Sequence, residues 1–87
     1  MIKPEHLLTV GTLYETTETF VLEPMVHSDI DWLRYDKGST LLLINVRLFD
    51  DMHAHFTFLD NNGVLGYHTE YYVIGTTAKD LKAVSTP

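Results

Sequence analysis

The stretch 37–67 constrains the fold of this chain most, because it holds three apolar runs separated by two polar turns. The runs are 41–49, 53–59 and 64–67, and the breaks between them are Asp50-Asp51 and Asp60-Asn61-Asn62-Gly63. Short runs rich in Val, Ile, Thr and aromatic residues, bounded by Asp, Asn and Gly, are typical of β-strands. Asn62-Gly63 is a strong hairpin signal, since both residue types tolerate positive φ. The sequence therefore predicts a three-stranded antiparallel meander.

Alternation along these runs predicts which side chains face the core. Around the second run, the predicted core face consists of Met52, Ala54, Phe56 and Phe58, and the opposite face of His53, His55, Thr57 and Leu59. In the first run, Asn45 and Arg47 are expected to face water, which turns Leu42, Ile44, Val46 and Leu48 inward. Leu41 and Leu43 would then face outward, where a second layer or a partner must cover them.

The flanking segments predict further short strands. Segments 7–14 and 20–22 are expected to pair as an irregular hairpin with its tip near Thr16-Thr17, and Gly11 suggests a bulge or a close backbone approach. A strand at 32–35, a tight helical turn at 68–71, a strand at 72–74 and a helical turn from Ala78 capped by Thr77 complete the expected elements. The predicted fold class is all-β: a five- or six-stranded antiparallel barrel with at most one or two short helical turns. A single domain, 1–87, is expected, with the barrel core at 7–77 and a C-terminal turn and tail at 78–87.

Composition narrows the functional classes. The chain has no cysteine, so a disulfide framework and a thiolate metal site are excluded. Hydrophobic residues make up 45% of it, which favours a folded core over disorder. No stretch approaches the roughly 18 apolar residues of a membrane span, and no leader pattern opens the chain. We therefore expect a soluble cytoplasmic protein without a membrane partner.

Charge is unevenly distributed along the chain. The net charge of −6 disfavours direct binding to nucleic acid, because phosphate backbones repel an acidic protein. Between Lys3 and Arg34 there is no Lys or Arg, while six acidic residues fall there: Glu5, Glu15, Glu18, Glu23, Asp29 and Asp31. Such a segment is expected to attract a cationic partner. An ordinary solvated loop that keeps the protein soluble is the alternative.

The order of short motifs resembles that of Src-homology-3 domains over residues 13–74. Thr12-Leu13-Tyr14-Glu15-Thr16 is similar to the family's opening A-L-Y-D-Y, 33–39 to its K-G-D step, 63–69 to its G-x-x-G-(F/Y) step, and Tyr71-Tyr72-Val73 to its closing strand. The resemblance implies a small antiparallel barrel. Tyr14 and Tyr72 match two aromatic residues of the family's groove for proline-rich peptides. The groove Trp is replaced by Met52, His53 or His55 and the groove Pro by Thr69, so polyproline recognition is not carried over.

Catalytic and metal chemistry find little support in the residues. His53 and His55 lie on one face of a strand at a spacing that suits metal ligation, but two surface histidines without a third ligand are the favoured interpretation. Neither Ser28, Ser39 nor Ser85 has the sequence context of a nucleophile, and no glycine-rich phosphate loop is present. We therefore predict no catalytic residue, no metal and no cofactor.

The leading functional hypothesis is a non-enzymatic protein-interaction module that binds a cationic protein surface through an acidic loop and an aromatic groove. The predicted contact residues are Tyr14, Glu15, Glu18, Glu23, Asp29, Asp31, Trp32, Tyr67 and Tyr72. Trp32 is either a groove residue or simply part of the core. One alternative is a small acidic inhibitor, of phage or plasmid type, that blocks a basic nucleic-acid site of a host enzyme. Another is a structural homo-oligomer that buries Leu41, Leu43 and Phe49 between copies.

Overall fold

The computed structural model describes residues 8–25, 32–48, 50–71 and 77–84. Within these ranges seven antiparallel strands form one sheet: β1 (Leu13–Thr16), β2 (Phe20–Pro24), β3 (Leu33–Tyr35), β4 (Thr40–Leu48), β5 (His53–Leu59), β6 (Leu65–Tyr71) and β7 (Leu81–Ala83). A short 3₁₀ turn, η3 (Thr77–Asp80), precedes β7. The strand order is β3-β2-β6-β5-β4-β1-β7, with β3 and β7 at the two edges.

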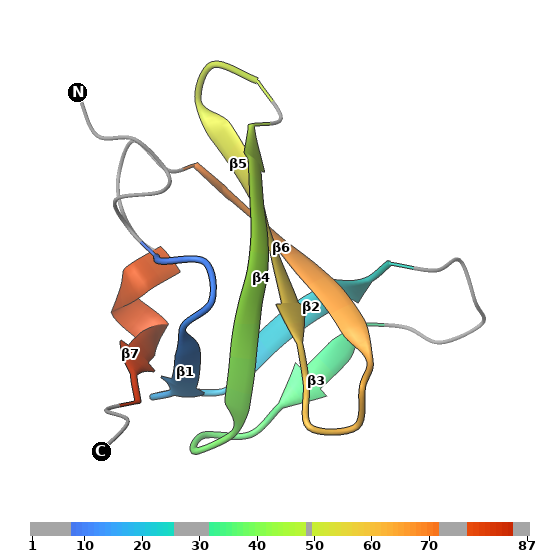
Figure 1. The fold of residues 1–87 in the computed structure, drawn as a ribbon, viewed down its shortest axis with the longest axis vertical. Helices are drawn as coiled ribbons and strands as arrows, with labels where there is room; N and C mark the ends of the chain where they lie inside the picture. The colour runs from blue at the N-terminus through green and yellow to red at the C-terminus, as the bar shows by residue number, and fades with distance from the viewer. Residues whose placement is uncertain (1–7, 26–31, 49, 72–76, 85–87) are drawn as a thin grey trace.

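The sheet curls strongly on itself into an open half-barrel (Figure 1). The prediction of an all-β antiparallel fold is therefore confirmed. The predicted count of five or six strands differs from the seven observed. One reason is at the C-terminal end of the described chain, where the expected helical turn covers only Thr77–Asp80 and 81–83 form a further strand.

The central meander is confirmed: β4 pairs with β5, and β5 with β6. Its second turn owes its shape to Gly63, whose φ of 77° lies in the left-handed region that glycine adopts without strain. The Gly63 amide donates to the Asp60 carbonyl at 3.1 Å, and the Asp60 amide donates to the Val64 carbonyl at 3.0 Å. Asn62 keeps a negative φ. The connection is thus a turn followed by a left-handed glycine.

A bulge in β4 overturns one half of the predicted face assignment. The pairing with β5 shifts register between Leu43 and Asn45, so that Ile44 is the extra residue. Beyond the bulge, Val46 packs against the core as predicted. Before it the prediction was wrong, because Leu41 and Leu43 have 0% exposure. Ile44 at the bulge and Leu48 at the end of β4 were predicted to face inward, but both are exposed.

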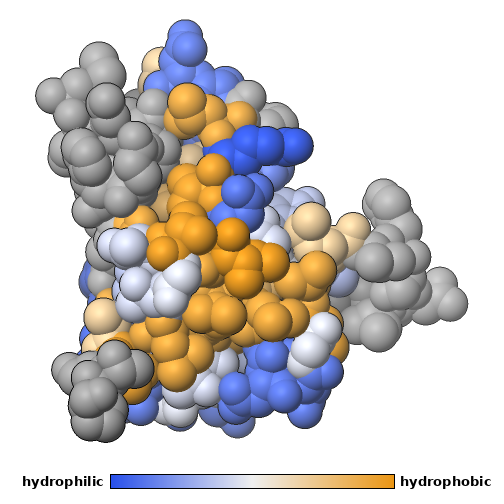
Figure 2. All heavy atoms as spheres, in the orientation of Figure 1, coloured by the Kyte–Doolittle hydropathy of each residue, from blue (hydrophilic) through white to orange (hydrophobic). Residues whose placement is uncertain are grey.

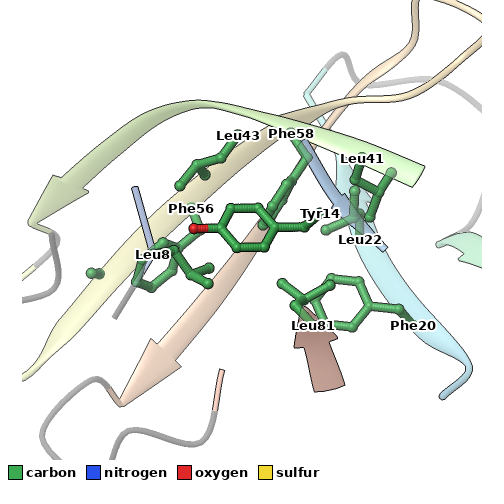
Figure 3. Close-up of a cluster of buried hydrophobic side chains, with 10 residues drawn as sticks. Leu8, Tyr14, Phe20, Leu22, Leu41, Leu43, Phe56, Phe58 and Leu81 are labelled. Carbon is green, nitrogen blue, oxygen red and sulfur yellow. The ribbon is translucent and has the colours of Figure 1, made fainter. Parts of the chain in front are cut away.

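The core lies on the concave face of the half-barrel (Figure 3). It contains Leu8, Tyr14, Phe20, Leu22, Leu41, Leu43, Ala54, Phe56, Phe58 and Leu81. The Tyr14 ring lies in the middle of this cluster, and its hydroxyl accepts a hydrogen bond from the Thr9 amide at 2.7 Å. The core positions predicted for β5 are confirmed, whereas Met52 precedes the strand and is exposed.

Several local predictions were wrong because strand pairing over long distances decided the outcome. The hairpin expected between 7–14 and 20–22 does not form: β1 pairs with β4 and β7, while β2 pairs with β3 and β6. Residues 68–71 belong to β6 instead of a helical turn. The other predicted helical turn, from Ala78, does form, at Thr77–Asp80, and β7 follows it. The predicted strand 72–74 lies outside the described residues.

Gly66 allows a close approach between β6 and the strands β2 and β3. It pairs with Pro24 where β2 meets β6. A Cβ atom at this position would lie 2.8 Å from the Cβ of Leu22 and 2.9 Å from Cδ1 of Leu33. The absence of a side chain on Gly66 therefore lets β2 and β3 fold over the end of the meander.

Candidate functional site

Four leucines on the convex face of the sheet line up across four strands. Leu13 of β1 pairs with Leu42 of β4, Leu42 with Leu59 of β5, and Leu59 with Leu65 of β6. Alternation turns these four side chains outward, because the strand neighbours Tyr14, Leu41, Leu43 and Phe58 are buried in the core and Leu65 lies directly opposite Leu59. We call them the leucine row, and the convex face that carries them the outer face.

The leucine row is part of a wider apolar surface. Val64 and Leu65 are each 40% exposed at the start of β6, and Ile44 is exposed at the bulge. Figure 2 shows hydrophobic surface gathered over the middle of the molecule, across β4 and the strands beside it. A monomeric soluble protein rarely exposes a large contiguous apolar patch, and such patches mark interaction sites.

A hollow with a volume of about 270 Å³ opens on the outer face beside the leucine row. Its described lining consists of Met25, Asn45, Arg47, His55, Thr57 and Tyr67. The register explains how they meet. Asn45, Thr57 and Tyr67 are cross-strand neighbours on β4, β5 and β6, and Arg47 lies directly opposite His55 in the next outward row.

Two aromatic rings form one wall of the hollow. His55 and Tyr67 stack with ring centroids 4.9 Å apart and an interplanar angle of 29°. Tyr67 also hydrogen-bonds to Glu23, its partner on β2. This hydrogen bond, together with burial and the Glu23 charge, raises the pKa of Tyr67. Tyr67 is therefore a neutral donor at ordinary pH, and its ring orientation is held from two sides.

The predicted contact residues occupy different parts of the molecule. Tyr14 lies in the core, so its predicted place in a surface groove is wrong. Trp32, directly before β3, is 61% exposed and is therefore not a core residue. Glu18 is exposed in the connection between β1 and β2. Asp29, Asp31 and Tyr72 lie outside the described residues.

Only part of the predicted contact set comes together. Glu23 and Tyr67 lie side by side at one end of the outer face. Glu15 stands on the outer face of β1, two residues after Leu13, and its carboxylate lies 3.3 Å from Nζ of Lys82 on β7. The leucine row is thus flanked by one carboxylate on β1 and another on β2.

Sequence reasoning missed the leucine row and the hollow. Alternation did assign Leu59 and the histidines of β5 to the outward side. The bulge at Ile44 reversed the assignment of Leu42. The alignment of Leu13 with Leu65 required the pairing of four strands, which no local signal supplies.

The two histidines of β5 share the outer face, as their spacing predicted, but have different neighbours. His53 Nδ1 lies 2.9 Å from Oδ1 of Asp50, which also accepts hydrogen bonds from the amides of Met52 and His53 at 2.8 Å each. These donors, the Met52 amide first, lower the pKa of Asp50. His55 instead stacks on Tyr67. Among the described residues, no group of three or more His, Cys, Asp or Glu is placed to hold a metal ion.

A second polar hollow, of about 210 Å³, lies at the turns that end β3 and β5. Tyr35 donates its hydroxyl hydrogen to Asp60 at 2.7 Å, and the amides of Asn62 and Val64 donate to the same carboxylate at 2.8 and 2.9 Å. Burial opposes ionisation of Asp60, but these three hydrogen bonds outweigh it and lower its pKa. Burial, followed by the contact with Asp60, raises the pKa of Tyr35. This carboxylate is engaged in holding the turn.

A third polar group lies on the concave side. His68 Nε2 is 2.6 Å from Oε2 of Glu70, and the His68 ring contacts Phe20 with centroids 5.2 Å apart. Both side chains are largely covered. The two side chains lie within hydrogen-bond distance of each other, and the His68 ring packs against Phe20 of the core.

Comparison with protein-family models, with curated proteins and with solved structures finds no match. In the part of the chain that is described, no helix has the length and apolar character needed to cross a membrane. Function must therefore be inferred from the chemistry of the outer face.

Proposed function

We propose that this protein is a non-enzymatic protein-interaction module whose docking surface is the outer face of β1, β4, β5 and β6. The observation that carries the proposal is the leucine row, extended by Ile44 and Val64, on the solvent side of the sheet. Covering apolar surface of this kind releases about 25 cal/mol per Å² in favour of association. A partner protein is the natural source of that cover.

The neighbourhood of the row has the composition of a protein interface. Tyr67 is a rigid aromatic residue anchored by His55 and Glu23, and tyrosine is enriched among residues that dominate binding energy. An apolar centre with a polar rim is the usual anatomy of such surfaces. Here the rim consists of Glu15 at one end of the row and Glu23 at the other.

Charge favours a partner with basic side chains around an apolar centre. The chain carries a net charge of −6, which accelerates encounter with a cationic surface. The Glu15–Lys82 pair is solvent-exposed, and exposed pairs of this kind contribute at most about 1 kcal/mol. Glu15 can therefore exchange Lys82 for a cation of the partner at little cost, and Glu18 adds charge nearby.

We further propose that the chain is a single domain related in architecture to Src-homology-3 barrels. The motif order supports this, as do the meander and the helical turn before the strand that pairs with β1. Polyproline recognition is not part of the proposal, because Tyr14 is a core residue here and the family's groove Trp and Pro are missing.

The test is a pull-down with three forms of the protein: wild type, Leu65→Glu and Thr69→Glu. Both substitutions place a carboxylate on the outer face of β6, but Leu65 belongs to the leucine row, whereas Thr69 lies opposite His55, four residues further along β6. Leu65→Glu should abolish recovery of any partner that wild type retains. Thr69→Glu should keep it. Equal recovery by both variants, or no recovery by wild type above blank beads, would contradict the proposal.

The residues that were predicted from the sequence to mediate self-association do not support it. Leu41 and Leu43 are fully buried within one copy, and Phe49 lies outside the described residues. Docking of a second copy through the leucine row would appear as a dimer in light scattering, and Leu65→Glu would convert it to a monomer. That outcome would replace the cationic partner with an identical chain.

A further inference from the structure

The hollow on the outer face has a lining that contrasts with the charge of the chain. Its described lining contains no acidic residue, although the net charge is −6. Four of the side chains that line the hollow carry hydrogen-bond donors: Asn45, Arg47, His55 and Thr57. Arg47 forms no ion pair within the part of the chain that the structure describes.

The four donors form a compact block on two adjacent strands. Asn45 lies opposite Thr57, and Arg47 lies opposite His55, one outward row further along. Side chains directly opposite on an antiparallel pair have Cβ atoms about 4.5–5.5 Å apart. The block can therefore surround a single small polar group.

The buried hydroxyl of Thr57 is an independent observation that points to a ligand at this block. It is only 8% exposed, and its hydroxyl makes no side-chain hydrogen bond to any described residue. Buried hydroxyls are normally hydrogen-bonded, because an unsatisfied one costs about 1–3 kcal/mol. This hydroxyl belongs to a residue that lines the hollow together with Arg47.

Two rings and the Met25 side chain complete the wall. The stacked rings of His55 and Tyr67 form one part of it, and Met25 another. The nearest carboxylate in the register, Glu23, is hydrogen-bonded to Tyr67. The hollow thus pairs a cluster of donors with a surface suited to a ring or a short alkyl chain.

We propose that this hollow binds a carboxylate carried on a compact aromatic or apolar body. The planar fork of Arg47 matches the two carboxylate oxygens, and the hydroxyl of Thr57 and the amide of Asn45 donate to the same group. The volume of about 270 Å³ lies just below the roughly 300–1,000 Å³ of pockets for drug-sized ligands, which suits a smaller ligand. The site is separate from the leucine row, so either proposal can fail without the other.

The experiment is a titration followed by two-dimensional amide NMR at fixed pH and ionic strength. Benzoate is the probe, benzyl alcohol is its uncharged counterpart, and chloride controls for salt. Benzoate should shift the amide signals of Asn45, Arg47, His55, Thr57 and Tyr67 along saturable curves. Benzyl alcohol and chloride should leave them in place.

Variants identify the groups that hold the carboxylate. Arg47→Gln should weaken benzoate binding at least about tenfold, as expected for loss of a charge-assisted hydrogen bond. Thr57→Val keeps the shape of the side chain, and it should weaken binding several-fold without unfolding the protein. Arg34→Gln is the matched control, because Arg34 is an exposed arginine on β3 outside the lining. It should bind benzoate as wild type does.

Two probes separate the sources of the carboxylate. Benzoate represents a free small acid, and N-acetylphenylalanine represents the carboxyl terminus of a peptide. Tighter binding of the second would assign the hollow to a chain end, and tighter binding of the first to a small molecule. Absence of saturable shifts with either probe would overturn the proposal, and so would equal weakening by Arg47→Gln and Arg34→Gln.

Discussion

The inner and outer faces of β5 are built from alternate residues of one strand, yet they do different work. Ala54, Phe56 and Phe58 face inward and are completely covered. His55 and Leu59 face outward and keep part of their surface in solvent. The inner side chains are enclosed by the core, whereas His55 and Leu59 keep part of their surface in contact with solvent. In so small a domain, the residues that stabilise the fold are therefore separable from those available for binding.

The largest expected effect on stability comes from a substitution on the inner face. Phe56→Ala should destabilise the protein by about 3–5 kcal/mol, because Phe56 is fully buried and its removal leaves a cavity. Urea denaturation followed by circular dichroism measures the loss. Phe56→Leu retains part of the volume and gives a measurable transition if the alanine variant does not fold.

Thr69→Ala on the outer face of β6 is the control for that comparison. Thr69 is exposed, so the free energy of unfolding should change by no more than about 0.5 kcal/mol. A similar loss of stability in Phe56→Ala and Thr69→Ala would show that the outer face contributes as much to the free energy of unfolding as the inner face does.

Gly66→Ala tests the close packing of Gly66 against Leu22 on the inner face. The new methyl group would meet the Cβ of Leu22 at 2.8 Å, which forces a backbone shift. We expect destabilisation of about 1–3 kcal/mol in the same assay. Gly63→Asn is the matched change at a turn glycine with open space around it, and asparagine tolerates its positive φ. A larger loss of stability in Gly63→Asn than in Gly66→Ala would contradict the conclusion that Gly66 is the crowded position of the two.

A smaller effect concerns pH and the turn held by Asp60. Its pKa is lower in the folded protein than in the unfolded chain, so the folded state binds fewer protons as Asp60 titrates. The resulting stability is fully present above the ordinary carboxyl pKa near 4, and it is lost as pH falls through the lowered value. Urea denaturation between pH 2 and pH 6 should show a shallower acid loss in Asp60→Asn than in wild type. An identical pH profile would exclude this role.

Only a small change in stability is expected from a substitution on the leucine row. Leu65→Thr shortens a half-exposed side chain and favours a strand, so the free energy of unfolding should stay within about 0.5–1 kcal/mol of wild type. Partner recovery should nevertheless fall strongly, because the apolar contact is lost. If the variant binds its partner normally but is strongly destabilised, Leu65 stabilises the fold and does not contact the partner.

The same contrast between faces explains what the sequence could predict. The meander followed from alternating residues and from turns such as Asp60–Gly63, which are local signals. The bulge could not be foreseen, since the run 41–44 is uniformly apolar and shows no alternation. The pairing of β1 with β4 and β7 joins residues far apart in the chain, and no local pattern encodes it.

The candidate site depended on this long-range information. Glu23 and Tyr67 were both selected from the sequence, and they do lie together. Tyr14 was selected as their companion because it matches a family motif, whereas its ring fills the core. The leucine row and the opposed Arg47 and His55 became visible only through the register of the sheet.

The most direct test of the docking surface is a methyl NMR spectrum of the protein with and without the partner recovered in the pull-down. Leucine and isoleucine methyl groups report on both faces at once. The account predicts that signals of the leucine row and of Ile44 shift or broaden, while those of Leu22, Leu41 and Leu43 in the core stay in place. Shifts confined to residues away from the outer face would contradict it.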